Sequence, residues 1–149
     1  MNVNIIDRLS EQQVEELWQL YRLEFWSRDR QLEDVRQMLK HSDVIVALCQ
    51  EVDGKLLGFA RILTDFVYRA VIFDVIIESS YRDRGLGRKL MEAIVNHPRL
   101  TSIEYLSLFC LSDMIPFYQK FGFAELDIDL RLMLKKGNGQ SIGSQRTVS

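Results

Sequence analysis

Cysteine, histidine and proline are scarce in this chain, which has two of each among its 149 residues. Cys49 and Cys110 stand apart in apolar runs, without a Cys-x-x-Cys pair or a histidine cluster beside them. A structural zinc site or a dithiol centre needs several such side chains at close spacing. We therefore expect two reduced thiols in the core and no bound metal.

Long apolar runs and a strong net charge are also missing. No segment is long and apolar enough to span a membrane, and residues 1–7 lack the basic start and cleavage site of a secretory signal. The formal net charge of -2 provides no general attraction to nucleic acid. We therefore expect a cytoplasmic protein that binds neither a membrane nor a nucleic acid.

The sequence does contain enough apolar material for one domain. Hydrophobic residues make up 47% of the chain, which is typical of a globular protein of this length with a substantial core. Residues 137–149 have almost nothing to bury, so we expect them to form a disordered tail. The domain is therefore expected to cover residues 1–136.

Apolar periodicity and turn residues predict both strands and helices. Ser10 to Gln13 has the pattern of a capping box, and Asp53-Gly54 is typical of a hairpin turn. The expected strands are residues 2–9, 43–51, 55–64, 70–78, 102–111 and 123–135, and the expected helices are residues 10–25, 32–39, 85–97 and 112–121. The strand, helix, strand unit at 70–111 predicts two parallel strands with a ligand at their carboxyl ends.

The junction between the strand at 70–78 and the helix from residue 85 is the most informative segment. It reads Arg82-Asp83-Arg84-Gly85-Leu86-Gly87-Arg88-Lys89. The first N–H groups of a helix have no intrahelical acceptor and lie at the positive end of its dipole, so they can bind a phosphate. The glycines allow a ligand close to the backbone, and Arg82, Arg84 and Arg88 add positive charge. The pattern is typical of a pyrophosphate site.

Two separated motifs resemble those of the GCN5-related N-acetyltransferase (GNAT) family. Residues 82–87 match its acetyl-CoA signature, (Arg or Gln)-x-x-Gly-x-(Gly or Ala), and Phe117-Tyr118-Gln119-Lys120-Phe121-Gly122-Phe123 matches a downstream aromatic pair followed by Gly-Phe. The resemblance implies a single-domain α/β (α+β) fold with a mixed central β-sheet flanked by helices. It also implies acetyl-CoA as co-substrate, with the diphosphate on the backbone from about Arg84 to Lys89 and the pantetheine along Val75, Ile76 and Ile77.

The resemblance also suggests a general acid. Tyr118 lies where family members often have a tyrosine that protonates the departing thiolate, and a phenol with a pKa of about 10 suits that role. A tyrosine ring packed in the core is the alternative. The chain departs from the family pattern at Leu111, where an asparagine often contacts the coenzyme.

The general base is less clearly indicated. Family members often have a glutamate at the position of Phe73, which cannot accept a proton. Asp74 is the adjacent acid and our candidate, although strand alternation turns it to the other face unless a bulge intervenes. Asp74 could equally be a buried carboxylate paired with neighbouring N–H groups or with an arginine such as Arg61. The other candidates are Glu24, Asp65, Glu78 and water.

Four aromatic residues could line a pocket for the acceptor: Trp26, Phe66, Tyr68 and Phe109. Aromatic residues at helical spacing are more often ordinary core, which is the alternative for such side chains. An aromatic lining would favour an aryl or alkyl amine. Charged residues nearby leave polyamines and peptide amines open.

These observations predict an enzyme that transfers an acetyl group from acetyl-CoA to a primary amine of a small molecule or peptide, by direct attack in a ternary complex. A dinucleotide-binding oxidoreductase is disfavoured because Leu90 occupies the third glycine position of its fingerprint. A non-catalytic acyl-CoA-binding sensor or interaction domain with the same fold is the alternative, supported by Phe73 and Leu111. An exposed sheet edge would allow a homodimer.

Overall fold

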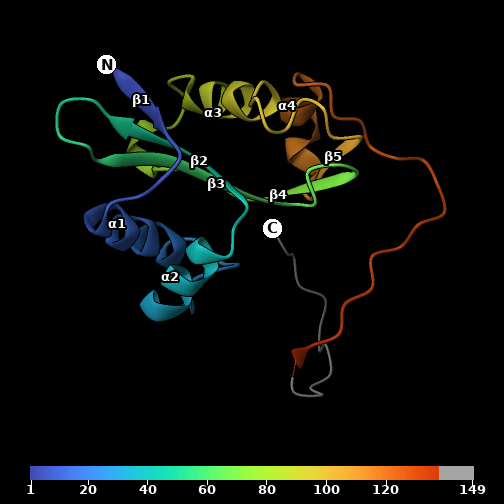
Figure 1. Ribbon diagram of the computed structural model, residues 1–149, viewed down its shortest axis with the longest axis horizontal. Coiled ribbons are helices and arrows are strands. Elements are labelled where there is room, and N and C mark those ends of the chain that lie inside the picture. The colour runs from blue at the N-terminus through green and yellow to red at the C-terminus, as the bar shows by residue number, and fades with distance from the viewer. Residues whose placement is uncertain (138–149) are drawn as a thin grey trace. The chain divides into compact units, whose positions relative to one another are not determined.

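The computed structural model describes residues 1–137, and the ribbon is shown in Figure 1. Contacts along the chain divide it into two units, one made of Met1–Phe109 and a second that begins at Cys110. The tail expected at 137–149 lies outside the described residues, apart from Gly137.

The first unit is built on a five-stranded mixed sheet. Its strands are β1 (Val3–Ile6), β2 (Val44–Gln50), β3 (Leu56–Thr64), β4 (Arg69–Ile77) and β5 (Tyr105–Leu108), in the spatial order β1-β2-β3-β4-β5. Neighbours pair antiparallel except β4 and β5, which are parallel, with Arg69 opposite Tyr105 and Ile72 opposite Leu108. The predicted parallel unit and the mixed sheet are therefore confirmed.

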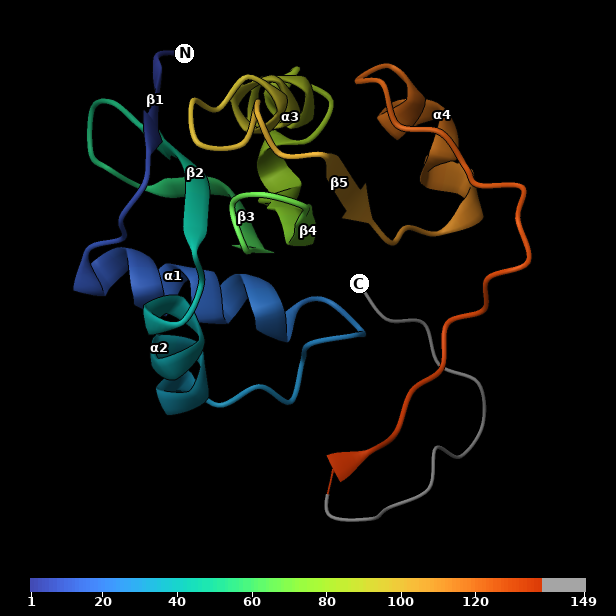
Figure 2. The same cartoon turned by 45° about the vertical axis from the view of Figure 1, so that its right-hand side comes forward.

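Helices cover both faces of this sheet. α1 (Glu11–Arg22) and α2 (Leu32–Lys40) lie on one face, and α3 (Leu86–Val95) lies on the other (Figures 1 and 2). A short 3-10 turn, η1 (Ser79–Tyr81), connects β4 to the loop before α3. Among the described residues, no helix has the length and apolar composition needed to cross a membrane.

Local sequence signals place the ends of these elements. The Ser10 hydroxyl accepts a hydrogen bond from the Gln13 N–H, and the Gln13 side chain accepts one from the Ser10 N–H, which completes the predicted capping box. Gly54, with φ 75°, turns the hairpin between β2 and β3. The Gln13 amide also donates to the Gly54 carbonyl at 2.8 Å, so the start of α1 is tied to that hairpin.

The core under α1 and α2 explains why these helices dock on the sheet. Three side chains are fully buried in it, those of Leu17 and Tyr21 of α1 and that of Phe59 of β3. Leu17 and Tyr21 are four residues apart and therefore share one face of the helix. α3 buries a matching stripe on the other face, made of Leu86, Leu90, Met91 and Ile94. The sheet is thus apolar on both sides, and a charged group inside it needs a partner.

The second unit departs from the predicted elements. It contains a 3-10 turn, η2 (Ser112–Met114), and a short helix, α4 (Ile115–Gln119), in place of one helix over 112–121. No strand forms over 123–135, although that segment alternates as expected for one. Alternation creates an apolar face, but a strand also needs a neighbour for its N–H and C=O groups. In the structure, six apolar side chains stay exposed there: Leu126, Ile128, Leu130, Leu132, Met133 and Leu134.

We predict that Leu17→Ala strongly destabilises the first unit. The Leu17 side chain is fully buried, and truncating a buried leucine removes apolar contacts and leaves a cavity, at a cost of about 2–5 kcal/mol. Leu23→Ala, at a position 74% exposed directly after α1, is the matched control and should change stability by less than about 0.5 kcal/mol. Urea unfolding followed by circular dichroism measures both. Equal effects would mean that the α1 face is not the core.

Candidate coenzyme and acceptor site

The loop before α3 presents the helix N-terminus without a side-chain cap. Gly85 is the N-cap residue and has φ 79°, in the left-handed region that a glycine adopts without a Cβ clash. Asp83 has φ 61°, and aspartate is one of the few other residues that tolerate this region. Within the described residues, none of the N–H groups from Asp83 to Arg88 has an acceptor. Donors of this kind at the positive end of a helix dipole can bind an anion, so this loop stays the predicted diphosphate site.

The basic side chains of this loop have defined partners. The Arg82 guanidinium donates to the Ile77 carbonyl at 3.1 Å and to Glu24 at 2.9 Å. Arg88 pairs with Glu92 one turn along α3, at 3.3 Å. Arg84 lies over the ring of Tyr81, with its guanidinium carbon 5.2 Å from the ring centre. Lys89 is exposed and Leu86 is buried, so Leu86 can contribute its N–H but not its side chain.

Among the described residues, no second strand pairs with β4 over the residues predicted to hold pantetheine, although the Ile77 carbonyl accepts from Arg82. β5 pairs with β4 only from Arg69 to Ile72. Beyond Ile72, the ladder on β4 joins it to β3 alone, with Ile76 opposite Phe59 and Ile77 opposite Gly58. An unpaired strand edge is the feature that an extended amide-bearing ligand can extend by hydrogen bonding. Val75, Ile76 and Ile77 lie on this stretch.

A β-bulge interrupts β4 at Asp74. Phe59 pairs with Ile76 and Arg61 pairs with Phe73. Two residue steps on β3 therefore correspond to three residue steps on β4, which leaves one extra residue on β4. Asp74 has φ 59°, an unusual conformation for a strand residue and one that is costly without support. In a regular strand, alternation would place the side chains of Phe73 and Asp74 on opposite faces. The bulge interrupts that alternation at Asp74. It turns the Asp74 side chain into the interior beneath the sheet.

Three donors converge on one oxygen of the Asp74 carboxylate. The Tyr21 hydroxyl, Arg30 Nη1 and Arg61 Nε each lie 2.8 Å from Asp74 Oδ2. The Asp74 side chain is fully buried, whereas those of Arg30 and Arg61 are 31% and 14% exposed. The sequence-based alternative of a carboxylate paired with Arg61 is therefore what the structure contains. No local sequence pattern indicates Tyr21 or Arg30 as further partners of Asp74, because they lie 53 and 44 residues away along the chain.

The protonation of this cluster follows from its charges. Burial alone would raise the pKa of Asp74, but the hydrogen bonds and positive charges of Arg30 and Arg61 outweigh it and lower that pKa. Burial and the negative charge of Asp74 raise the pKa of Tyr21 well above its usual value. Asp74 is thus ionised and tightly paired at neutral pH. A carboxylate with a lowered pKa is a weak base, so this geometry does not favour Asp74 as the general base.

The other candidate bases are also engaged. Glu24 pairs with Arg82, and the Glu78 carboxylate accepts from the N–H and the hydroxyl of Ser80. One Asp65 oxygen accepts from the N–H groups of residues 67, 68 and 69, and these bonds lower the pKa of Asp65. Each carboxylate has a structural role in a turn or an ion pair.

Tyr118 belongs to the second unit, on α4. It is buried, and its ring lies edge-on to those of Phe117 and Phe123. Burial, followed by the influence of Cys110, raises the pKa of Tyr118 to about 12. The phenol therefore keeps its proton at physiological pH, which a proton donor requires. Leu111, at the start of the same unit, is 45% exposed.

The four aromatic candidates for an acceptor pocket have different surroundings. Trp26 is half-buried, edge-on to Tyr21 and 5.4 Å from the Arg30 guanidinium carbon. Phe66 lies under the guanidinium of Arg99, at 4.3 Å, in the turn between β3 and β4. Tyr68 and Phe109 are 61% and 46% exposed. No ring contact within the described residues joins any of the four to another.

Comparison with known proteins finds a family match and several relatives. Residues 11–123 match the family described as Acetyltransferase (GNAT) family. The uncharacterized N-acetyltransferase ycf52 of Porphyra purpurea is 38% identical over 96 residues, which cover 63% of this chain and 55% of that protein. Serotonin N-acetyltransferase 2, chloroplastic, of Oryza sativa subsp. japonica is 35% identical over 97 residues, covering 64% and 48%. The chain thus spans about half the length of these curated relatives.

A solved structure supports the same assignment. A putative acetyltransferase of the GNAT family from Xanthomonas campestris pv. campestris superposes with a TM-score of 0.76 at 27% identity, covering 93% of this chain and 96% of that one. The family match includes the loop before α3, the β4 bulge and the Phe117–Phe123 motif. The chain therefore belongs to the GNAT family of acetyltransferases.

Proposed function

We propose that this protein transfers an acetyl group from acetyl-CoA to a primary amine of a small molecule or peptide, by direct attack in a ternary complex. The observation that carries the proposal is the start of α3 at Gly85, whose first N–H groups have no acceptor among the described residues, next to the stretch of β4 that β5 does not pair. The first matches a diphosphate and the second matches the amides of pantetheine. Both lie in the first unit.

The chemistry requires few groups once the thioester is held. The amine nitrogen attacks the thioester carbonyl carbon, the C–S bond breaks, and the departing sulfur takes up a proton. Tyr118 is our candidate for donating that proton, because its phenol is protonated and lies in the second GNAT motif. The four candidate carboxylates are paired. We therefore propose that the attacking amine loses its proton to water.

The acceptor class is inferred from two facts. Trp26 is half-buried within the segment that follows α1, and an indole at such a place favours an aryl or alkyl amine. The rice relative is named a serotonin N-acetyltransferase. We propose an arylalkylamine as the first acceptor to test. A cytoplasmic location remains our prediction, while that relative is named as chloroplastic.

One observation favours the second candidate function, a non-catalytic acyl-CoA-binding domain. Phe73 occupies the position of the family glutamate, and Asp74 beside it is held in an ion cluster. Such a domain would bind acetyl-CoA through the same loop without turnover. An assay that separates binding from turnover distinguishes the two functions.

We predict that acetyl-CoA raises the melting temperature, because a ligand that binds only the folded state stabilises it. Free thiol should then appear when an amine is added. Serotonin, spermidine, glucosamine and a lysine-containing peptide form the panel, with a thiol-reactive dye as the readout. Stabilisation without thiol release for any amine would establish the binding domain instead. The absence of both effects would contradict coenzyme binding.

Gly87→Glu should abolish stabilisation by acetyl-CoA. Gly87 is the second residue of α3, and a carboxylate there repels the diphosphate and obstructs the backbone donors. The fold should persist, because a negative charge in the first turn of a helix is favourable. Gln12→Glu adds the same charge at the second residue of α1 and is the control. Retained binding in Gly87→Glu would place the diphosphate elsewhere.

Tyr118→Phe should lower kcat by a factor on the order of 100, the typical contribution of a general acid. The affinity for acetyl-CoA, measured by calorimetry, should stay the same because only the hydroxyl is lost. Tyr105→Phe, at a position 60% exposed on β5, serves as the control and should behave like the wild type. If Tyr118→Phe keeps full turnover, Tyr118 has no part in proton transfer.

A further inference from the structure

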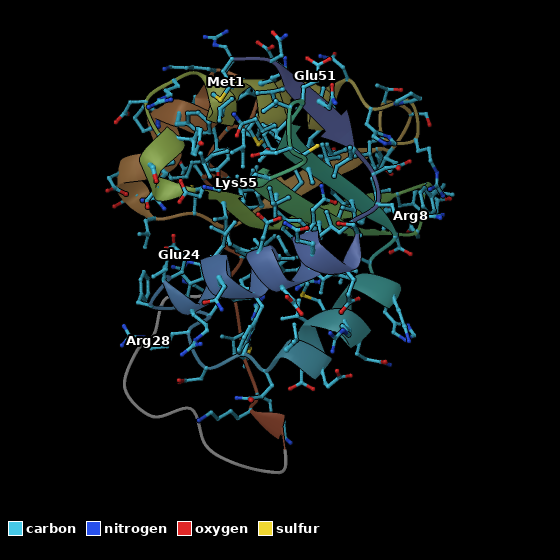
Figure 3. The ribbon with its side chains drawn as sticks, turned by 90° about the vertical axis from the view of Figure 1, so that its left-hand side faces the viewer. Met1, Arg8, Glu24, Arg28, Glu51 and Lys55 are labelled. Carbon is cyan, nitrogen blue, oxygen red and sulfur yellow. The ribbon has the colours of Figure 1, made fainter. Side chains whose placement is uncertain are left out.

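The segment between α1 and α2, residues 23–31, is tied at both ends to groups around β4. Near its start, Glu24 binds Arg82, which also donates to the Ile77 carbonyl at the end of β4. Near its end, Arg30 binds Asp74 at the bulge. Figure 3 shows Glu24 at the end of α1 and Arg28 further along the same segment. The segment is therefore held beside the strand that carries the pantetheine edge.

Arg30 contacts two aromatic rings as well as Asp74. Its guanidinium carbon lies 4.5 Å from the ring centre of Tyr21 and 5.4 Å from that of Trp26. Its carbonyl accepts a hydrogen bond from the Trp18 indole at 2.9 Å. Arg30 thus links the bulge, α1 and the candidate acceptor residue Trp26 through one side chain and one backbone group.

The contacts of Asp74 make Arg30 separable from the fold. Among the donors described above, Tyr21 comes from α1, Arg61 from β3 and Arg30 from the connecting segment. Without the Arg30 guanidinium, Asp74 would keep a phenol and a guanidinium at 2.8 Å. The bulge should therefore survive the loss of Arg30, while the part of the segment nearest α2 would lose its anchor to β4 and Glu24 would still hold the other end.

We propose that Arg30 is a positioning residue for the acceptor amine: by binding Asp74 at the β4 bulge, it fixes residues 23–31, including Trp26, relative to the thioester edge. This inference rests on the proposed function. An attacking nitrogen and a carbonyl carbon must meet within a narrow range of distance and angle, so a displaced binding element lowers the rate steeply. The diphosphate loop is joined to the opposite end of the segment, through Arg82 and Glu24, so coenzyme affinity should not depend on Arg30.

Arg30→Gln tests this directly, with Arg36→Gln as the control. Both arginine side chains are 31% exposed, but Arg36 pairs with Glu11 and Glu33 on the surface of α1 and α2. With the best amine of the panel, Arg30→Gln should lower kcat/KM for the amine by a factor on the order of 10 to 100. The Kd for acetyl-CoA should stay within about twofold, and Arg36→Gln should match the wild type.

A second variant and a pH profile separate positioning from general destabilisation. Arg30→Lys keeps the charge but loses the planar fork and its stacking, so it should recover part of the rate. The acid limb of the pH–rate profile should keep its position in Arg30→Gln. Tyr21 and Arg61 still bind Asp74 in that variant, so Asp74 stays ionised and paired and does not become a general base. Assays well below the melting temperature of each variant exclude losses from unfolding.

The outcomes distinguish this inference from the proposed function. If the wild type releases no thiol with any amine, the proposed function fails and this inference fails with it. If the wild type is active and Arg30→Gln matches Arg36→Gln, only this inference is overturned. Parallel loss of acetyl-CoA and amine affinity would also overturn it, because Arg30 would then support the whole site. If Arg30→Gln does not fold, Arg30→Lys against Arg36→Lys provides the same comparison.

Discussion

A buried negative charge in β4 joins α1, β3 and the segment before α2. The Asp74 carboxylate has no exposed side-chain surface, and an ionised group so placed needs close partners because water cannot solvate it. Those partners come from α1, from β3 and from the segment before α2. Leaving a buried carboxylate with no charged partner at all typically costs about 3–5 kcal/mol. The cluster therefore stabilises the bulge and holds α1 and the segment before α2 against β4.

The two halves of the proposed coenzyme site depend on this arrangement in different ways. The loop at Gly85 forms by local backbone geometry, since a left-handed residue opens α3 and leaves its first N–H groups without acceptors. The β4 edge depends on the sheet, because β5 pairs with β4 only as far as Ile72. Arg82 joins the two halves through the Ile77 carbonyl. The anion site and the strand edge are thereby adjacent.

Much of the fold could be predicted because its signals are local. The capping box at Ser10 and Gln13, the Asp53-Gly54 turn and the glycines at 85 and 87 each act within a few residues. The Asp74 cluster could not be predicted in the same way, because Tyr21 and Arg30 meet it only after the helices have docked. The strand expected at 123–135 shows the converse. Its alternation is a local signal, but a strand also needs a hydrogen-bonding neighbour, and no periodicity in the sequence can specify one.

The charges beneath the bulge do not cancel. Arg30 and Arg61 share the single carboxylate of Asp74, so this cluster carries one more positive than negative charge. The second positive charge must therefore be stabilised by something other than a carboxylate. Arg30 provides this itself, because its side chain is 31% exposed to water and its guanidinium lies over the rings of Tyr21 and Trp26.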